Sequence, residues 1–217
     1  MADKTTKAHQ RYALADGTQV PGVTTILNIL DKPALIHWAW ELGMQQQDYR
    51  KVRDKAANIG TIAHQLIECD IKQIPFDPSA YAPQDVDRAE NAYLAWLEWT
   101  RHYHLATVHS ELQLVSEEYR YGGTLDWVAR KGDRVWLIDF KSSKGIYEEM
   151  KYQLAAYQAL WNENYPNDQI AQCHLIRLGK DDGNFEHHRY LDLSREFEIF
   201  KHCLAIYQLR RNAKKRN

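Results

Sequence analysis

Two acids and a lysine with chemically useful spacing lie near the middle of the chain. Asp126 follows Gly122-Gly123-Thr124-Leu125, and Asp139 and Lys141 flank Phe140 further along. Carboxylates bind divalent cations, and a lysine can stabilise negative charge that develops on a reacting group. A divalent metal and a phosphodiester would need these three side chains in one place.

The surrounding sequence predicts a β-hairpin that brings the acids together. Residues 124–130 and 135–141 are rich in β-branched and aromatic types, and Lys131-Gly132-Asp133 supplies the turn. Side chains alternate along a strand, so Asp139 and Lys141 share one face.

Folding the hairpin about Gly132 and Asp133 places Asp126 opposite Asp139, to within one residue. Directly paired residues have Cβ atoms about 5 Å apart, where like charges repel. A cation between the carboxylates would relieve that repulsion. The alternative is an Asp139–Lys141 ion pair on a solvated sheet face, with Asp126 an ordinary residue.

The next segment, Tyr147 to Asn162, predicts a helix because it lacks Gly and Pro and is rich in good helix formers. Gln153 and Tyr157 are four residues apart and so project together. Their amide and phenol could bind a backbone phosphate or hold a carboxylate. Alternatively, Tyr157 is half-buried core and Gln153 is solvated.

A histidine lies on an earlier predicted helix, Val52 to Cys69. The apolar stripe of that helix holds Ile59, Ala63 and Leu66, and the neighbouring stripe holds Gly60, His64 and Glu68. His64 could ligate a metal, with Gly60 leaving room for approach. It could equally be an ordinary surface or core residue.

Together these motifs resemble a known family. Gly60-Thr61-Ile62-Ala63-His64, Gly123-Thr124-Leu125-Asp126, Asp139-Phe140-Lys141 and Gln153-Leu154-Ala155-Ala156-Tyr157 occur in the order seen in the RecB-like branch of the PD-(D/E)XK nuclease superfamily. The likeness is closest to phage-type exonucleases and the mitochondrial genome maintenance exonuclease. Pro21 to Leu27 also resembles the amino-terminal segment of phage-type members, so the similarity runs from about Val20 to Tyr157.

The resemblance implies a role for each matching residue. The implied metal ligands are His64, Asp126, Asp139 and the Phe140 carbonyl; Lys141 matches the catalytic lysine, and Gln153 and Tyr157 match substrate-positioning residues. Leu125 stands where the superfamily name has proline, a change common in this branch. The roles of Glu68 and Glu111 are left open: either could hold a metal ligand in place or bind the metal through a water molecule.

The implied activity is a divalent-metal-dependent DNA exonuclease that uses one or two Mg²⁺ or Mn²⁺ ions. Its implied setting is phage-type DNA recombination, repair or replication, with a duplex end or single strand as substrate and a single-strand annealing or binding protein as a further partner. Two alternatives stay open: a site-specific or structure-specific endonuclease of the same superfamily, and a non-catalytic nucleic-acid-binding module. The first would cut closed circular DNA, whereas an exonuclease needs an end.

Composition agrees with one enzyme domain. The chain has 217 residues, is 44% apolar and has a net charge of −1. That length favours one domain, 1–217, with a mostly helical front at about 20–105 and a sheet core with a closing helix at about 106–212. A near-neutral total favours DNA ends or a threaded strand over broad adhesion to duplex. The basic residues of the tail could contact phosphates or simply be solvated: Arg210, Arg211, Lys214, Lys215 and Arg216.

Several function classes are disfavoured. No apolar run is long enough for a membrane span, and Met1 to Gln10 lacks a signal-peptide core, so a cytoplasmic location in a bacterium or phage-infected host is expected. Cys69, Cys173 and Cys203 fit neither a disulfide framework nor a zinc knuckle, and three cysteines cannot build the four-cysteine iron–sulfur cluster of some relatives. Buried free thiols are expected.

The order of predicted elements indicates an α/β fold: a PD-(D/E)XK restriction-endonuclease-like core, with a mixed sheet flanked by helices, behind a helical amino-terminal part. Trp96, Trp99 and Tyr103 lie near one helical stripe and predict core packing, with base stacking as the alternative. Other expected helices cover 24–30, 34–47, 85–104 and 194–211. Expected strands cover 11–15, 107–115, 118–130, 170–178 and 185–191.

Overall fold

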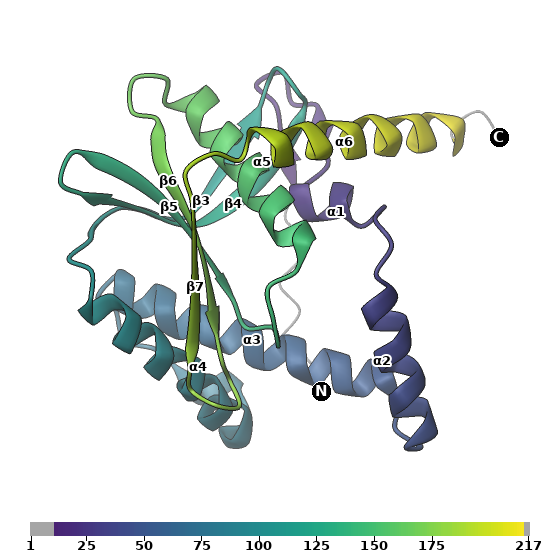
Figure 1. Cartoon of the computed structure of the whole chain (residues 1–217), viewed down its shortest axis with the longest axis vertical. Helices are drawn as coiled ribbons and strands as arrows, with labels where there is room; N and C mark the ends of the chain where they lie inside the picture. Colours follow the sequence, from purple (N-terminus) through teal and green to yellow (C-terminus); the bar gives the residue numbers. More distant parts are fainter. Residues whose placement is uncertain (1–10, 215–217) are drawn as a thin grey trace.

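A five-stranded sheet forms the centre of the computed structural model, which describes residues 11–214 (Figure 1). The spatial order follows the chain: β3 (Ala106–Ser116), β4 (Tyr121–Lys131), β5 (Arg134–Lys141), β6 (Ile170–Leu178) and β7 (Phe185–Tyr190). A separate two-stranded sheet joins β1 (Tyr12–Ala13) to β2 (Gln19–Val20). The predicted mixed α/β architecture is confirmed.

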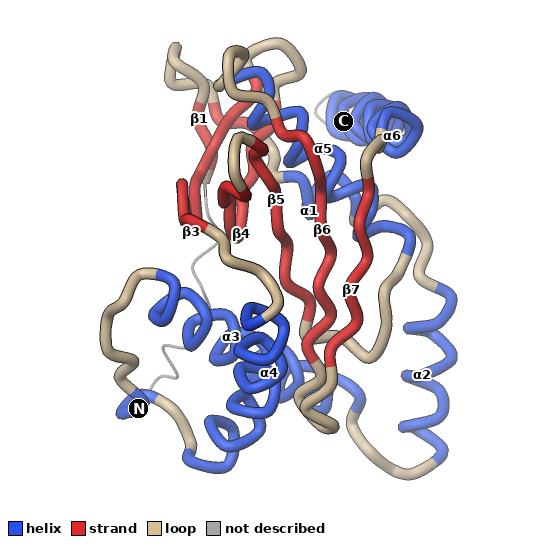
Figure 2. Tube along the Cα trace, turned by 60° about the vertical axis from the view of Figure 1, so that its left-hand side comes forward, coloured by secondary structure: helices blue, strands red, loops and turns tan. Residues whose placement is uncertain are grey.

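Helices cover both faces of the main sheet (Figures 1 and 2). One face carries α3 (Tyr49–Ile71) and α4 (Pro83–Arg101); the other carries α1 (Val23–Leu27), α5 (Glu148–Asn164) and α6 (Ser194–Lys214). Helix α2 (Pro33–Met44) stands at the edge of the molecule, and a short 3₁₀ turn spans Pro78–Ala80. None of the helices in residues 11–214 has the length and apolar character needed to cross a membrane.

Local sequence explains where these elements begin and turn. Pro33 and Pro83 open α2 and α4, where a missing N–H costs nothing. The Asp48 carboxylate accepts a hydrogen bond from the Arg50 N–H and caps α3. Gly132 has φ +59° in the turn between β4 and β5, a conformation that glycine adopts without strain.

The predicted hairpin of β4 and β5 is confirmed. Its antiparallel ladder runs from Lys131 opposite Arg134 to Trp127 opposite Ile138 and ends there, one residue short of Asp126 and Asp139. The next pair, β5 and β6, is parallel, and α5 is the crossover between them. This crossover brings Gln153 and Tyr157 back over the end of β5.

The two faces of β5 enter different cores. Val135 and Leu137 belong to the cluster under α5 and α6, whereas Trp136, Ile138 and Phe140 belong to the cluster under α3 and α4. Each large apolar side chain removed from water contributes about 1.5–3 kcal/mol to folding. This burial fixes the strand's orientation and therefore the side on which Asp139 and Lys141 lie.

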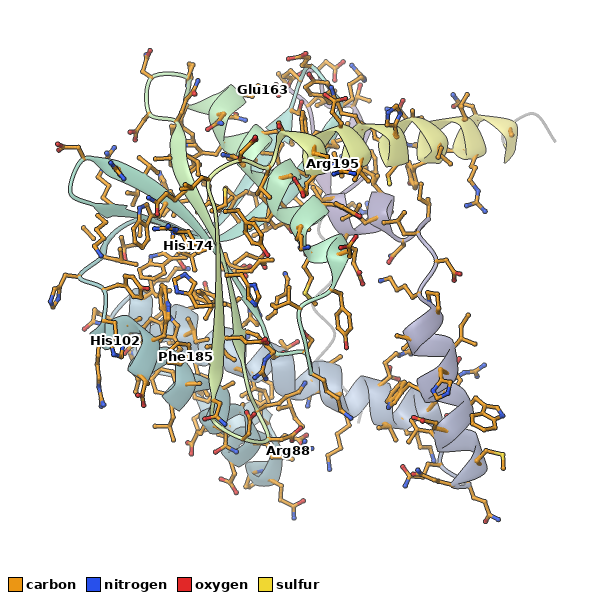
Figure 3. All side chains as sticks on the ribbon, in the orientation of Figure 1. Arg88, His102, Glu163, His174, Phe185 and Arg195 are labelled. Carbon is orange, nitrogen blue, oxygen red and sulfur yellow. The ribbon has the colours of Figure 1, made fainter. Side chains whose placement is uncertain are left out.

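The side chains between the sheet and α4 are densely packed, with His174 of β6 among them (Figure 3). Trp96 and Trp99 are 4% and 0% exposed, so core packing is confirmed and the base-stacking alternative fails for these two residues. Cys173 and Cys203 are buried free thiols, as expected, whereas Cys69 is free but only half-buried.

Most predicted boundaries agree with the structure to within a few residues, but two segments differ. Residues 118–120 were expected in a strand; they form part of a turn, in which Arg120 adopts φ +60°. The short β2 was not predicted. Arg210 and Arg211 are exposed on α6, whereas residues 1–10, Lys215 and Arg216 lie outside the described range. The organisation of 1–217 as one domain stays a prediction.

Candidate active site

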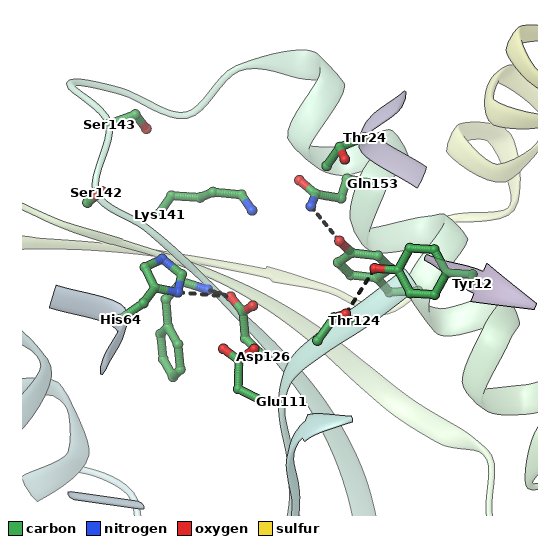
Figure 4. A pocket seen from close by; sticks show the side chains of 12 residues that line it. Tyr12, Thr24, His64, Glu111, Thr124, Asp126, Lys141, Ser142, Ser143 and Gln153 are labelled. Atoms are coloured by element: carbon green, nitrogen blue, oxygen red, sulfur yellow. Dashed lines mark hydrogen bonds and ion pairs between the residues drawn. The ribbon is translucent and has the colours of Figure 1, made fainter. Parts of the chain in front are cut away.

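Three potential metal ligands converge from three elements. His64 comes from α3, Glu111 from β3 and Asp126 from β4, and one ligand atom from each lies within 4.8 Å of the others. His64 Nδ1 is 3.8 Å from Asp126 Oδ2. All three side chains are half-buried (Figure 4). The structure therefore brings together two of the predicted ligands and adds Glu111 to them.

The position of Glu111 depends on an irregularity in β3. The register shifts between Thr107 and His109, so β3 carries one extra residue there. The pairs on either side, Ser110 with Trp127 and Leu112 with Leu125, place Glu111 across from Asp126. Without the shift, alternate side chains of β3 would face the other way.

Glu111 also has φ +52°, which is unfavourable for a residue with a side chain. Such strain is found where the surrounding fold holds a residue for function. The other residue left open by the sequence, Glu68, pairs with Lys72 on its own helix. Of the two glutamates, Glu111 is therefore the better candidate for a metal ligand.

Asp139 and Lys141 form a close pair beside this cluster. Lys141 Nζ lies 2.5 Å from Asp139 Oδ2, and Asp139 is only 1% exposed. The contact lacks hydrogen-bond geometry, so both Asp139 oxygens are without a hydrogen-bond partner among residues 11–214. At 2.5 Å no other atom fits between the ammonium and the carboxylate, so the two groups form a direct ion pair.

Burial is the main cause that raises the pKa of Asp139; Lys141 opposes it, and the charge of Asp126 adds to it. Asp139 is not in the three-residue group that gathers within 4.8 Å. The backbone N–H of Phe140 donates to Asp126 Oδ2 at 2.9 Å, which ties the end of β5 to Asp126. The charged residues thus form two neighbouring groups, joined through Phe140.

Gln153 and Tyr157 project together from α5, as predicted. Gln153 Nε2 donates a hydrogen bond to the Tyr157 hydroxyl at 2.7 Å. Burial raises the pKa of Tyr157 well above its usual value, and the negative charge of Asp139 adds to the effect. Tyr157 therefore remains a neutral phenol at physiological pH.

These groups line a cavity of about 420 Å³ (Figure 4). His64, Glu111, Asp126 and Lys141 supply its charged side chains. Hydroxyl and amide groups supply the rest of its polar lining: Tyr12, Thr24, Thr124, Ser142, Ser143, Gln153 and Tyr157. Sequence reasoning missed the first five of these. One available signal was the pair Gly122-Gly123, because glycine inside a strand marks a close approach of another group.

The donor set fits a divalent cation. Carboxylates suit Mg²⁺ and Mn²⁺, and an imidazole is a common ligand of transition metals. Asp139 Oδ2 pairs with Lys141, but Oδ1 is buried with no hydrogen-bond donor among residues 11–214. This unpaired oxygen next to the cluster is a second indication, because buried carboxylate oxygens otherwise find donors. His64, Glu111 and Asp126 are the residues that would hold the ion, with Asp139 adjacent.

Comparisons with solved structures find distant similarities. A candidate exonuclease from Eubacterium rectale has 9% identity and a TM-score of 0.46 over 70% of this chain and 65% of that one, so the chain spans less than two thirds of its length. An alkaline exonuclease, LHK-Exo, from Laribacter hongkongensis has 17% identity and a TM-score of 0.36 over 59% of this chain and 73% of that one.

No curated protein matches the chain. The model of one protein family, described as the PD-(D/E)XK nuclease superfamily, matches residues 34–215. That match spans most of the chain and includes the three candidate metal ligands, His64, Glu111 and Asp126. The protein therefore belongs to the PD-(D/E)XK nuclease superfamily and is a metal-dependent nuclease.

Proposed function

We propose that the protein is a DNA exonuclease that hydrolyses phosphodiester bonds with Mg²⁺ or Mn²⁺. The observation that carries this proposal is the convergence of His64, Glu111 and Asp126 beside Lys141 in one cavity. Three separate elements, a helix and two strands, supply these residues, and a strained backbone holds one of them. A surface ion-pair network needs neither feature.

The proposed roles follow from charge and position. His64, Glu111 and Asp126 hold the metal, and Asp139 and the Phe140 carbonyl complete the set. The bound ion supplies an acidified water and neutralises charge on the reacting phosphate. The Phe140 N–H donates to Asp126 Oδ2 and so fixes this carboxylate at the end of β5.

Lys141 is proposed as the catalytic lysine. Its ammonium lies in the cavity against Asp139, which keeps it beside the metal ligands. There it orients the attacking water or stabilises the negative charge that grows on the phosphate. Gln153 and Tyr157 are proposed to hold the substrate strand through neutral donors, because a phosphate oxygen accepts from an amide or a phenol.

The choice of exonuclease over endonuclease rests on the resemblance of His64 and of the Gln153/Tyr157 pair to end-processing relatives. The setting in phage-type recombination, repair or replication, with a single-strand annealing or binding partner, rests on the same resemblance. A nuclease of this superfamily that is site-specific would instead cut DNA without ends. The third alternative, a binding module, would cut nothing.

One experiment separates the three. Linear duplex labelled at either its 5′ or 3′ end, a closed circle and a single strand are incubated with the protein, with and without Mg²⁺ or Mn²⁺. We expect metal-dependent loss of the linear substrates and an intact circle. Cleavage of the circle alone would overturn the exonuclease proposal, and no cleavage at all would favour the binding module.

Variants test the residues. Lys141→Ala and Asp139→Ala should abolish cleavage while leaving the far-UV circular dichroism unchanged. Asp133→Ala is the matched control, because Asp133 is an exposed acid in the turn of the same hairpin. Undiminished cleavage by Asp139→Ala would remove that residue from the site.

A further inference from the structure

The ring of Tyr12 is clamped between two glycines from distant parts of the chain. A Cβ atom on Gly122 would lie 2.4 Å from Tyr12 Cγ, and one on Gly22 would lie 2.9 Å from Tyr12 Cε2. The same two glycines form a backbone bridge, and the Gly122 N–H donates to the Pro21 carbonyl at 3.0 Å. Only residues without side chains leave room for the ring at this position.

The next glycine does the same for another tyrosine. A Cβ atom on Gly123 would lie 2.6 Å from Tyr157 Cε1. Because neighbouring residues of a strand face opposite sides, the glycine pair admits one tyrosine on each side of β4. Both tyrosines line the cavity, together with Thr124, the residue that follows the pair.

The hydroxyl of Tyr12 reaches the cavity through a specific contact. It lies 2.9 Å from Thr124 Oγ1, with either oxygen able to donate. Figure 4 shows Tyr12, Thr124, Thr24 and Gln153 grouped on one side of the cavity, across from His64 and Lys141. This side, which we call the hydroxyl wall, carries no formal charge.

A phosphate oxygen is the chemical partner that suits such a wall. Hydroxyls of Ser, Thr and Tyr are common donors to DNA phosphates, and they fix the register of the strand. A neutral hydroxyl can donate a hydrogen bond to a phosphate oxygen without adding a charge to the cavity. Since the charged side of the cavity is proposed to take the reacting phosphate, the hydroxyl wall would take another.

We propose that Tyr12 and Thr124 form a subsite for a non-scissile phosphate of the DNA strand, which positions the strand for cleavage. This inference rests on the proposed function. Tyr12 is then a substrate-positioning residue. It comes from β1, whereas the candidate metal ligands come from α3, β3 and β4. The alternative is that the Tyr12–Thr124 hydrogen bond only stabilises the fold and binds no substrate.

The first test measures binding without metal. A fluorescein-labelled single-stranded oligonucleotide is titrated with protein in EDTA, and its anisotropy gives the dissociation constant. Tyr12→Phe keeps the clamped ring but removes the hydroxyl, and it should weaken binding about tenfold, as expected for one hydrogen bond to a charged group. Tyr93→Phe is the matched control, because its hydroxyl donates to Asp70 Oδ1 outside the cavity.

The second test locates the phosphate. Substrates carry one neutral methylphosphonate at successive linkages, and KM and kcat are measured for each with Mn²⁺. For the wild-type protein, one non-scissile linkage should raise KM about tenfold; for Tyr12→Phe, the same linkage should have no further effect. Thr124→Val should behave like Tyr12→Phe.

The outcomes separate the two proposals. If the wild-type protein cleaves DNA but Tyr12→Phe loses only thermal stability, with unchanged binding and an unchanged methylphosphonate profile, the subsite is wrong and the nuclease proposal stands. If the wild-type protein cleaves no DNA, the proposed function fails, and the binding test in EDTA still decides whether the hydroxyl wall binds phosphate.

Discussion

Two regions of the protein bury polar groups in opposite ways. In the candidate active site, acids gather: burial and then the charge of Asp126 raise the pKa of Asp139, which pairs with Lys141. Between the sheet and α4, a histidine network of His174, His187, Trp99 and Tyr103 is held by hydrogen bonds between uncharged groups. One region concentrates charge, and the other excludes it.

The histidine network has a fixed direction. The Trp99 indole can only donate, so His187 Nδ1, at 3.2 Å, must accept. His187 therefore carries its proton on Nε2 and donates to His174 Nδ1 at 2.8 Å. His174 in turn carries its proton on Nε2 and stacks on Trp136, with ring centroids 4.2 Å apart. A second proton on either ring would break the chain.

The comparison separates polar groups that stabilise the fold, in the histidine network, from polar groups that are proposed to bind metal, in the cavity. Carboxylates held close together lower the stability of the fold unless a cation lies between them. The acids are therefore expected to serve metal binding and not stability. The histidine network satisfies most of its polar atoms without any formal charge, although His174 Nε2 is buried with no hydrogen-bond partner among the described residues. Substitutions should therefore separate activity from stability: changes in the acids reduce cleavage, and changes in the network reduce the free energy of unfolding.

The largest expected effect is on the charged side. Asp126→Asn keeps an acceptor for the Phe140 N–H but removes a charge, and it should reduce the rate of DNA cleavage by at least about a thousandfold, equivalent to about 4 kcal/mol. The melting temperature should stay the same or rise, because repulsion with Asp139 is lost. A large fall in melting temperature would show that Asp126 serves the fold instead.

Metal should stabilise the wild-type protein. A ligand that binds only the folded state at a hundred times its dissociation constant contributes about 2.7 kcal/mol. We expect Mn²⁺ to raise the melting temperature measured by calorimetry by roughly 5–10 °C for a domain of this size. Asp126→Asn should show little of this rise; an equal rise in both proteins would place the ion elsewhere.

The histidine network should show the reverse pattern. Trp99→Phe removes the donor that sets the network and leaves a small cavity, so urea unfolding should show a loss of about 2 kcal/mol. Cleavage should stay within about twofold of wild type, because no member of the network lines the active-site cavity. Trp40→Phe, at a position 61% exposed, is the matched control and should change stability by less than about 0.5 kcal/mol.

The smallest expected effect is a pH dependence. Burial lowers the pKa of His187 to about 4 and that of His174 to about 3, from an ordinary value of 6.5. The unfolded chain therefore binds more protons as pH falls from about 6.5 to about 4, and the free energy of unfolding decreases across that window. The melting temperature of His187→Gln should fall less steeply there. Parallel slopes would show that other groups govern the acid response.

The sequence predicted well what depends on local periodicity. Alternation along β5 placed Asp139 and Lys141 together, and helical spacing placed Gln153 beside Tyr157. Both contacts follow from residues close in the chain and from apolar neighbours that fix which face is buried. The superfamily was predicted for the same reason, since its motifs are short local patterns in a fixed order.

Apart from the meeting of His64 and Asp126, which the resemblance implied, contacts between distant segments were not predicted. Glu111 meets Asp126 only because β3 gains an extra residue before it, and neither that bulge nor a positive φ can be read from residue types. Tyr12 reaches Thr124 from the far end of the chain. Glycines 122 and 123 marked a close approach, but they did not say which side chains would fill the space.

The clamp around Tyr12 also bears on the order in which the protein folds. Tyr12 and Thr124 are 112 residues apart in sequence, and contacts of such separation form late because a long loop must close first. During synthesis the amino-terminal segment emerges long before β4 exists to receive it. We therefore expect the hydroxyl wall to be completed after the sheet has formed, when Glu111 and Asp126 of the neighbouring strands β3 and β4 already lie near one another.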